Sequence, residues 1–139
     1  MGCAVGHSTL AWVNAFPKTE VHGIDCGGGM IRYAHARAKH LGKTAHFSQQ
    51  NSEKTDFADN SFDIVISNHV IEHVGGFNEK LLHLREISRV LKPGGNLYLA
   101  FPNRYSVIEP HYKLPFLSWL PQNLADLYVK WAGKGEYFN

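Results

Sequence analysis

The stretch from Ser61 to Phe101 constrains the fold of this chain more than any other. It opens with an apolar run rich in β-branched residues, Phe62 to Ile66, which is typical of a strand covered on both faces in a parallel sheet. Pro93-Gly94-Gly95 predicts the end of a helix, and a second apolar strand is expected at Leu97 to Phe101. Strand, helix and strand in this order predict a βαβ unit, in which the two strands run parallel.

The helix of this unit is expected to begin after Asn78, whose side chain can act as an N-cap. Apolar residues then recur at helical spacing and predict the buried face. These residues are Leu81, Leu84, Ile87 and Leu91. The charged residues expected to face solvent are Glu79, Arg85, Glu86 and Arg89.

The preceding part of the chain alternates between helical and strand patterns. A glycine-containing turn leads into a helix to about Ala15, a strand spans Glu20 to Asp25, a helix follows from about Gly29 to Leu41, and another strand spans Ala45 to Gln49. This alternation predicts an α/β fold: a Rossmann-like, open, mostly parallel sheet with helices on both faces. Ligands of such sheets bind at the carboxyl ends of the strands.

Polar and glycine residues gather at that edge of the predicted sheet. They are the turn from Gly2 to Gly6, Asp25, Asn51 and Asn68. Asp25 follows Gly6 by nineteen residues (25 − 6). An acid about twenty residues beyond a glycine turn, at the end of the next strand, is placed to accept both hydroxyls of a ribose. Taken alone, Asp25 fits a solvated turn residue equally well, so the prediction depends on all four features together.

Composition excludes several classes of protein. The 139 residues suggest a single domain. The 14 basic and 12 acidic residues nearly balance and form no runs, so the sequence predicts no basic surface for nucleic acid. No apolar run approaches the ~20 residues that span a bilayer. With Cys3 and Cys26 as its only cysteines, the chain fits a reducing cytoplasm better than a disulfide scaffold, and both are expected to be free thiols. Its oligomeric state is left open.

Four segments resemble the class I S-adenosylmethionine-dependent methyltransferases, in the broad group that includes ubiquinone and menaquinone biosynthesis enzymes. They read GCAVG at Gly2, VHGID followed by MIRYA, DNSFDIVISNHVIEHV from Asp59, and RVLKPGGNLYL from Arg89. Together they extend from Gly2 to about Pro102, roughly three-quarters of the chain. The last two segments are specific in combination, whereas a glycine turn alone is not.

The resemblance implies a methyl transfer from S-adenosylmethionine to a small-molecule acceptor, and it assigns cofactor contacts to this chain. Gly2, Ala4 and Gly6 match the turn under the methionine part, Asp25 the acid on the ribose, and Met30 the adenine edge. Asn51 matches a position usually held by Asp, with Ser52 beside it, and Asn68 would approach the sulfonium. Ala4 stands where Gly is commoner, which slightly crowds the turn.

Catalytic side chains are less clearly indicated. An in-line methyl transfer needs mainly alignment and exclusion of water, and a base only when the acceptor carries a proton. His69 and His73 are the candidates for that base, although His73, expected on a short helix, fits a structural role better, and Glu72 fits a solvated or salt-bridged group. His69 and His73 also have the i, i+4 spacing of metal ligands, but no third ligand is evident, so no metal is expected.

The composition changes after Pro102. Residues 1–102 are expected to form the cofactor-binding core, and residues 103–139, rich in proline and aromatic side chains, a lid or substrate-binding segment of the same domain. Aromatic residues suited to an apolar or aromatic acceptor are Tyr105, His111, Tyr112, Phe116 and Trp119, and the same residues fit packing of the segment on itself equally well. The basic face needed for docking on a membrane surface is absent.

Two other classes compete. A nicotinamide-dependent oxidoreductase would share the glycine turn and the acid at Asp25. Its turn would, however, require the motif G-x-G-x-x-G, and this chain has Gly2, Ala4 and His7 at the three glycine positions. A non-catalytic cofactor-binding fragment would keep the motifs without the activity.

The resemblance also implies that the chain is incomplete at both ends. In the family, an apolar strand directly precedes the glycine turn and lies between the second and fourth strands, and here Met1 stands at its last position. Further strands would follow Gly133 to Asn139. We therefore expect either a gap or direct contact between the strands at Glu20–Asp25 and Phe62–Ile66, and weak stability of the isolated chain, because unpaired strand edges are costly.

Overall fold

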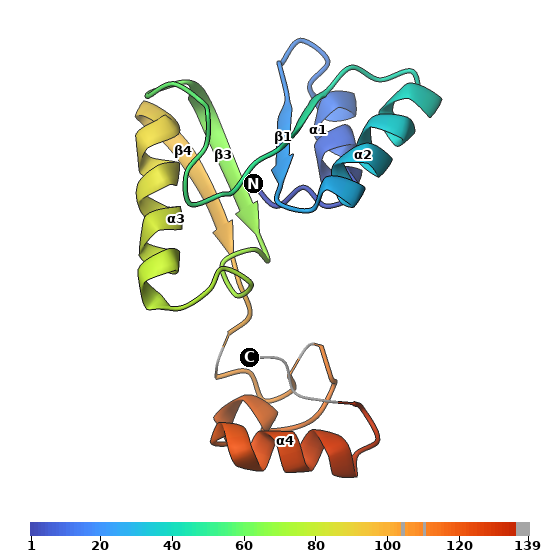
Figure 1. Cartoon of the computed structure of the whole chain (residues 1–139), viewed down its shortest axis with the longest axis vertical. Coiled ribbons are helices and arrows are strands. Elements are labelled where there is room, and N and C mark those ends of the chain that lie inside the picture. Colours follow the sequence, from blue (N-terminus) through green and yellow to red (C-terminus); the bar gives the residue numbers. More distant parts are fainter. Residues whose placement is uncertain (104, 110, 136–139) are drawn as a thin grey trace. The chain divides into compact units, whose positions relative to one another are not determined.

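The computed structural model describes residues 1–103, 105–109 and 111–135. The chain forms two compact units, Met1–Ala100 and Phe101–Asn139. The first contains α1 (His7–Ala15), β1 (His22–Asp25), α2 (Gly28–His40), β2 (His46–Gln49), β3 (Phe62–Asn68), α3 (Phe77–Val90) and β4 (Leu91–Ala100), and the second contains the 3-10 helix η1 (Leu117–Trp119) and α4 (Gln122–Trp131), as Figure 1 shows. No helix of the described residues is long and apolar enough to cross a membrane.

The strands form two separate parallel pairs in the first unit. β1 pairs with β2, with His22 opposite His46 and Asp25 opposite Gln49. β3 pairs with β4 in a second sheet. The predicted parallel α/β arrangement is therefore confirmed, and the strand bounds differ from those predicted by one to two residues at most for β1 and β2.

β1 and β3 are not hydrogen-bonded to each other as strands, so the expected gap between them is present. The first residues of the chain lie in part of this gap. The Met1 amine donates to the Ile66 carbonyl at 2.6 Å, and the Cys3 N–H donates to the Ile24 carbonyl at 2.8 Å. This short segment therefore connects the free edge of β3 to the free edge of β1.

β3 is covered on one face only, which corrects the prediction of a strand buried on both. Val65 and Ser67 are buried toward α3, whose Ile87 and Val90 pack against Val65. Ile64, on the other face, is 52% exposed. The almost unbroken apolar run was thus a correct sign of a strand but a wrong sign of two covering layers.

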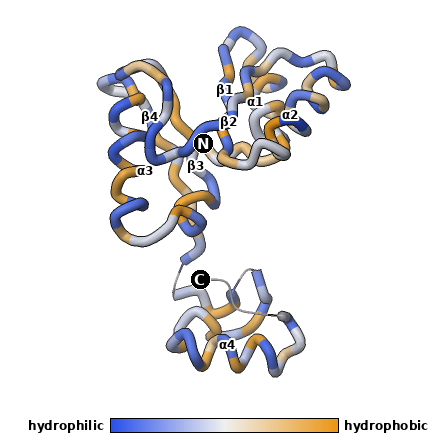
Figure 2. The backbone as a smooth tube through the Cα atoms, viewed as in Figure 1, coloured by the Kyte–Doolittle hydropathy of each residue, from blue (hydrophilic) through white to orange (hydrophobic). Residues whose placement is uncertain are grey.

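The buried face of α3 is also rotated from its predicted position. The buried residues of the helix are His83, Glu86, Ile87 and Val90, whereas Leu84 is exposed. Hydrophobic and hydrophilic residues alternate around this helix in Figure 2. The leucine spacing alone misplaced the face because a buried histidine and a buried glutamate, each with a polar partner, occupy it instead.

The end of α3 differs from the prediction as well. The helix ends at Val90, its N-cap is Gly76 rather than Asn78, and β4 begins directly at Leu91. Pro93-Gly94-Gly95 lies within a break in register, because Phe62 pairs with Leu91 and Ile64 pairs with Asn96. The left-handed φ of 77° at Gly94 accommodates this excursion.

The second unit has a small core of its own. Leu117, Ala125 and Val129 are fully buried, with Tyr112 and Tyr128 packed against them at the margin. On α4, Leu124, Leu127 and Trp131 are exposed, and the helix buries Ala125 and Val129 instead. The predicted lid, residues 103–139, includes Arg104 and Phe138, which lie outside the described residues.

A polar network fastens α3 to the loop that precedes β3. The buried Glu86 carboxylate accepts hydrogen bonds from the N–H and hydroxyl of Thr55, at 2.7 and 2.6 Å. Arg89 donates to both oxygens of Glu86, at 2.6 and 2.9 Å, and to Asp59 at 2.6 Å. The Arg89 guanidinium, together with Thr55, lowers the pKa of Glu86 from 4.5 to about 2 despite its burial.

This network predicts acid sensitivity. The Glu86 contribution is fully present above the ordinary value of 4.5 and is lost as the pH falls toward about 2, because the unfolded chain binds the proton more readily. We expect Glu86→Gln to lower the free energy of unfolding by about 2 kcal/mol near neutral pH and to flatten the acid loss of stability, measured by urea unfolding. Asp63→Asn, which removes an exposed pair with Lys92, is the control and should change little. Equal effects of both variants would contradict the role of Glu86.

Candidate functional site

The turn between Met1 and α1 presents bare backbone at the carboxyl end of β1. Gly2, Ala4 and Gly6 all have left-handed φ angles, of 65°, 44° and 78°. Three N–H groups of the turn are bonded within the protein: that of Cys3 to the Ile24 carbonyl, that of Ala4 to the Asp25 carboxylate and that of Gly6 to the Cys3 carbonyl. The sequence predicted all three residues as a cofactor-binding turn, and the structure shows why the turn is unusual.

Side chains are excluded from two of these positions. A Cβ built at Gly2 would lie 2.3 Å from Val70 Cγ2, and one at Gly6 would lie 2.9 Å from the Phe47 ring. Ala4 adopts a left-handed φ although it is not glycine, and such residues are uncommon outside turns and functional sites. The turn is therefore held in an unfavourable backbone conformation by its surroundings.

Asp25 holds this turn to the end of β1. Its Oδ2 accepts a hydrogen bond from the Ala4 N–H at 2.8 Å, and its Oδ1 accepts one from the Gly27 N–H at 2.9 Å. Each carboxylate oxygen has a further lone pair for another donor. Asp25 thus orders the glycine turn and the start of α2 together, and it remains able to accept from a ligand hydroxyl.

The residues predicted on the adenine side lie beside this carboxylate or on the neighbouring strand. Met30 is 48% exposed and packs near Gly27, with its Cγ 3.2 Å from a Cβ built there. Asn51 and Ser52 follow β2 in a turn, and the Asn51 Oδ1 accepts from the Glu53 N–H at 3.1 Å. The exposed amide of Asn51 keeps a second lone pair on that oxygen for a ligand donor.

Asn68 and His69 end β3 at the same side of the unit, because β1 and β3 run in the same direction (Figure 1). Asn68 is exposed and lines a pocket together with Gly2. His69 has a left-handed φ of 55°, and its Nδ1 lies 3.1 Å from Glu72 Oε1. Glu72 was expected to be either solvated or salt-bridged, and this contact agrees with the salt-bridged role. The contact also orients the exposed imidazole ring of His69.

His73 is placed differently from its prediction. It lies in a turn rather than on a helix, and its side chain is exposed rather than satisfying a buried backbone group. Its N–H donates to the Val70 carbonyl at 2.9 Å, which closes that turn. His73 therefore has solvent access but shares no contact with His69 in the described residues.

Ser67 and His83 form a buried pair next to Asn68 that the sequence did not predict. Ser67 and His83 are both fully buried, and Ser67 Oγ lies 3.0 Å from His83 Nε2. Burial lowers the pKa of His83, so the ring is neutral near pH 7. The pair fixes the end of β3 to α3 and thereby positions Asn68. The signal was available, because His83 precedes Ile87 by four residues on one helical face.

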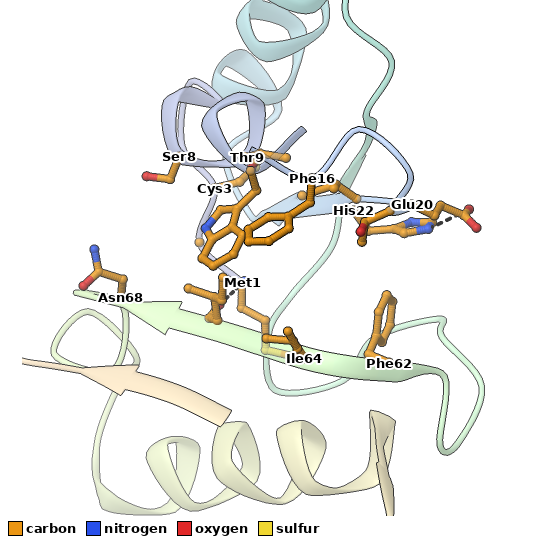
Figure 3. Close-up of a pocket in the computed structure, with 16 residues that line it drawn as sticks. Met1, Cys3, Ser8, Thr9, Phe16, Glu20, His22, Phe62, Ile64 and Asn68 are labelled. Atoms are coloured by element: carbon orange, nitrogen blue, oxygen red, sulfur yellow. Dashed lines mark hydrogen bonds and ion pairs between the residues drawn. The ribbon is translucent and has the colours of Figure 1, made fainter. Parts of the chain in front are cut away.

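A cavity of about 240 Å³ follows β3 from Phe62 to Asn68 and is bounded on the other side by β1 and α1. Figure 3 shows Phe16, Phe62 and Ile64 directed toward it, with Asn68 at one end and Glu20 and His22 at the other. The cavity therefore runs along the gap between the two sheets. Its walls are mainly apolar. Gly2 and Cys3 of the turn and Asn68 at the carboxyl end of β3 also line the cavity, whereas Asp25 is not among its lining residues.

Cys3 lies within the glycine turn and Cys26 directly after Asp25, and both are free thiols, as predicted. Burial, reinforced by the negative charge of Asp25, raises the pKa of Cys3 to about 11. Cys26 is exposed. The turn therefore carries no reactive thiolate at neutral pH, which is consistent with a binding rather than a nucleophilic role.

Comparison with known proteins places this geometry in a family. Residues 1–99 match the family described as "Methyltransferase domain". The chain is 32% identical over 131 residues to a ubiquinone/menaquinone biosynthesis C-methyltransferase of Chromobacterium violaceum, covering 88% of this chain and 52% of that protein. It is 26% identical to a ubiquinone biosynthesis O-methyltransferase of Parvibaculum lavamentivorans, covering 82% and 53%. The chain thus spans about half the length of these curated relatives.

A solved structure shares the fold of the first unit. A SAM-dependent methyltransferase from Methanosarcina mazei matches with a TM-score of 0.65 and 33% identity, over 70% of this chain and 48% of that one.

The environments of the two thiols predict different reactivities. At about pH 8, roughly one Cys3 thiol in a thousand is ionised, so Cys3 should react far more slowly with a disulfide reagent than the exposed Cys26. Absorbance of the released chromophore should show one fast and one slow phase, and Cys26→Ser should retain only the slow one. In denaturant both thiols should react alike. A single fast phase for two thiols in the native protein would contradict the burial of Cys3.

Proposed function

The chain belongs to the methyltransferase-domain family, and on this premise we propose that it transfers a methyl group from S-adenosylmethionine to a small-molecule acceptor. The observation that carries the proposal is the Asp25 carboxylate, which joins the left-handed turn at Ala4 to the start of α2 at Gly27. A carboxylate at the carboxyl end of β1, beside this tightly turned backbone, supports the proposal because it could accept from the hydroxyls of a ribose.

The residues present fit this cofactor. Gly2 and Gly6 have no Cβ to collide with Val70 or Phe47, so the turn can pack closely on these side chains in the left-handed conformation that the proposed site uses. Asp25 would accept from the ribose hydroxyls, Met30 would offer an apolar surface to the adenine, and Asn51 would accept from its amino group. When bound, S-adenosylmethionine supplies an electrophilic methyl group on a sulfonium.

The protein's own contribution is alignment and exclusion of water. Asn68, fixed by the Ser67–His83 pair behind it, would orient the reacting groups at the end of β3. His69 would accept a proton from a hydroxyl acceptor through its Nε2, since its Nδ1 faces Glu72. His73, on the next turn, is the alternative base.

The acceptor is proposed to be an apolar or aromatic molecule. Two relatives are named for ubiquinone and menaquinone biosynthesis, one as a C- and one as an O-methyltransferase, so a ring carbon and a ring oxygen are both candidates for the methylated atom. The exposed Trp119, with its ring 5.2 Å from that of Phe116, offers a surface for such a ring in residues 103–139. We propose that this segment acts as the acceptor-binding lid.

We also propose a cytoplasmic location. Two unpaired thiols, Cys3 and Cys26, are compatible with a reducing compartment. No nucleic-acid partner is proposed, because the 14 basic and 12 acidic residues nearly balance.

Cofactor binding is expected to depend on Asp25 through the ribose. Charge-assisted hydrogen bonds are worth about 1.5–3 kcal/mol each, so Asp25→Ala should weaken S-adenosylhomocysteine binding at least about tenfold in calorimetry. Because Asp25 also orders the turn, the 2′-deoxy form of the ligand separates the two roles. The wild type should discriminate against it, and Asp25→Ala should not.

Two controls accompany this experiment. Asp63→Ala removes an exposed carboxylate from β3 and should leave the affinity unchanged. NAD should bind far more weakly than S-adenosylhomocysteine, because G-x-G-x-x-G is absent. Tighter binding of NAD would overturn the proposed function, and equal loss of both ribose forms on Asp25→Ala would restrict Asp25 to a structural role.

The lid proposal predicts that acceptor and cofactor contacts are separable. Trp119→Ala should reduce transfer of a labelled methyl group to a short-tailed phenol or hydroquinone, while leaving cofactor affinity nearly intact. Trp131→Ala, at an 83% exposed position on α4, is the matched control and should keep the activity. Tyr112→Ala should also impair transfer, but Tyr112 packs on the core of its unit, so unfolding must be measured alongside. A loss of cofactor affinity on Trp119→Ala as large as that on Asp25→Ala would refute the lid.

A further inference from the structure

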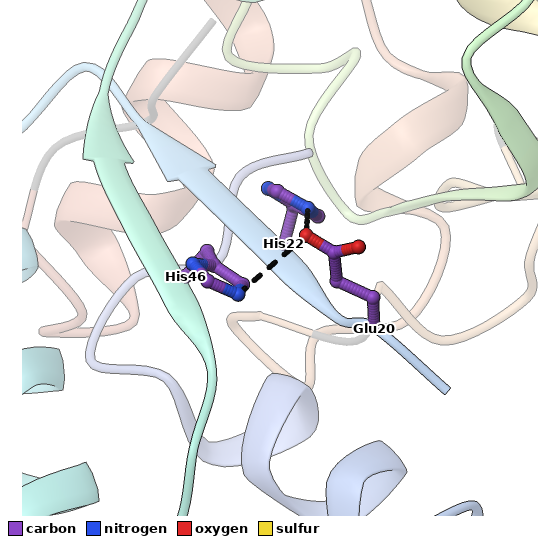
Figure 4. A group of neighbouring side chains, drawn as sticks. All are labelled: Glu20, His22 and His46. Atoms are coloured by element: carbon purple, nitrogen blue, oxygen red, sulfur yellow. Dashed lines mark hydrogen bonds and ion pairs between the residues drawn. The ribbon is translucent and has the colours of Figure 1, made fainter. Parts of the chain in front are cut away.

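Three potential metal ligands meet at the amino-terminal end of the β1–β2 pair. His22 begins β1, His46 begins β2, and the two are opposite each other in the parallel register. Glu20 precedes His22 by two residues, and alternate residues of an extended chain point to the same side. Figure 4 shows the Glu20 carboxylate directed toward both imidazole rings.

The distances between the ligand atoms suit a small tetrahedral ion. Glu20 Oε1 lies 2.9 Å from His22 Nε2 and 3.6 Å from His46 Nε2, and all three ligand atoms lie within 4.8 Å of one another. Ligands bound to Zn²⁺ at about 2.0–2.1 Å in a tetrahedron are separated from each other by about 3.4 Å. Small side-chain rotations would therefore bring the three atoms into one coordination sphere.

The rings are already held in place. His22 and His46 are stacked with their centroids 4.8 Å apart, and His22 also meets the edges of Phe57 and Phe62, each at 5.5 Å. The side chains of His46 and Glu20 are 56% and 70% exposed, so an ion can reach the cluster from solvent. Because the two imidazoles are stacked and the Glu20 carboxylate is exposed, little rearrangement is needed for the three side chains to bind an ion.

The cluster differs from the other histidine–carboxylate contacts of the chain. His69–Glu72 and His111–Glu109 are pairs, and within the described residues only Glu20, His22 and His46 form a group of three that could hold a metal ion. The sequence predicted no metal because the i, i+4 pair His69 and His73 lacked a third ligand. In this group, Glu20 and His22 are two residues apart on one extended segment, and His46 lies opposite His22 on the neighbouring strand.

We propose that Glu20, His22 and His46 bind Zn²⁺, with a fourth position open to water or an external ligand. Two imidazoles and a carboxylate suit Zn²⁺ in tetrahedral geometry. The cluster lies at the opposite strand end from Asp25, so it is separate from the proposed cofactor site. Bound Zn²⁺ would join the start of β1 to the start of β2 and stabilise that strand pair.

The test is calorimetry of ZnCl₂ with the metal-free 139-residue chain in a buffer that does not chelate. One equivalent should bind in the micromolar range or tighter and raise the midpoint of thermal unfolding. His46→Ala and Glu20→Gln, both at exposed positions, should each weaken binding roughly tenfold or more and abolish the thermal shift. His40→Ala, at an exposed histidine at the end of α2, is the control and should bind as the wild type does.

A second measurement identifies the ligands directly. Long-range ¹H–¹⁵N spectra of the imidazoles should show the Nε2 signals of His22 and His46 shifting together on addition of Zn²⁺, in the folded wild type. A Cys3→Ser, Cys26→Ser double variant should retain the binding, because thiols are not part of the proposed site. Absence of binding, or binding that persists in both His46→Ala and Glu20→Gln, would overturn the proposal.

Discussion

The Asp25 carboxylate is the contact on which the proposed site depends. It accepts from Ala4 and Gly27, so it connects the turn before α1, the end of β1 and the start of α2. The turn places a non-glycine residue, Ala4, at a left-handed φ, a conformation that needs compensation from its surroundings. A charge-assisted hydrogen bond to the Ala4 N–H provides it. The same carboxylate retains lone pairs that a ribose could use, so the order of the turn and the proposed ribose contact both involve this one side chain.

The gap between β1 and β3 is the second constraint. Parallel sheets are usually covered and continuous, yet here two separate pairs are joined by hydrogen bonds from Met1 and Cys3. The apolar cavity and the exposed Ile64 follow from this arrangement. Cys3 belongs both to this connection and to the glycine turn. The backbone from Met1 to Cys3 therefore links the width of the gap to the conformation of the proposed cofactor site.

The sequence was most informative where backbone requirements determine residue type. Glycines at left-handed positions, an acid after β1 and the order of strands and helices all led to the observed architecture. It was least informative about which face of a helix or strand is buried. Leu84 is exposed and Glu86 is buried, because Arg89 and Thr55 satisfy the glutamate and no helical-spacing argument registers that partnership. The Glu20–His22–His46 cluster was missed for a similar reason, since it depends on cross-strand register, which only the structure supplies.

A titration of the ¹⁵N-labelled chain with S-adenosylhomocysteine, followed by backbone amide shifts, would show whether the Asp25 carboxylate binds the ribose. The Ala4 and Gly27 N–H groups both donate to Asp25, so a ribose that engages this carboxylate must alter both. We expect saturable shifts at Ala4 and Gly27, with the amides of Gly2 and Gly6 shifting at the same ligand concentration. Saturable shifts that leave Ala4 and Gly27 unchanged, or no saturable shifts at all, would contradict it.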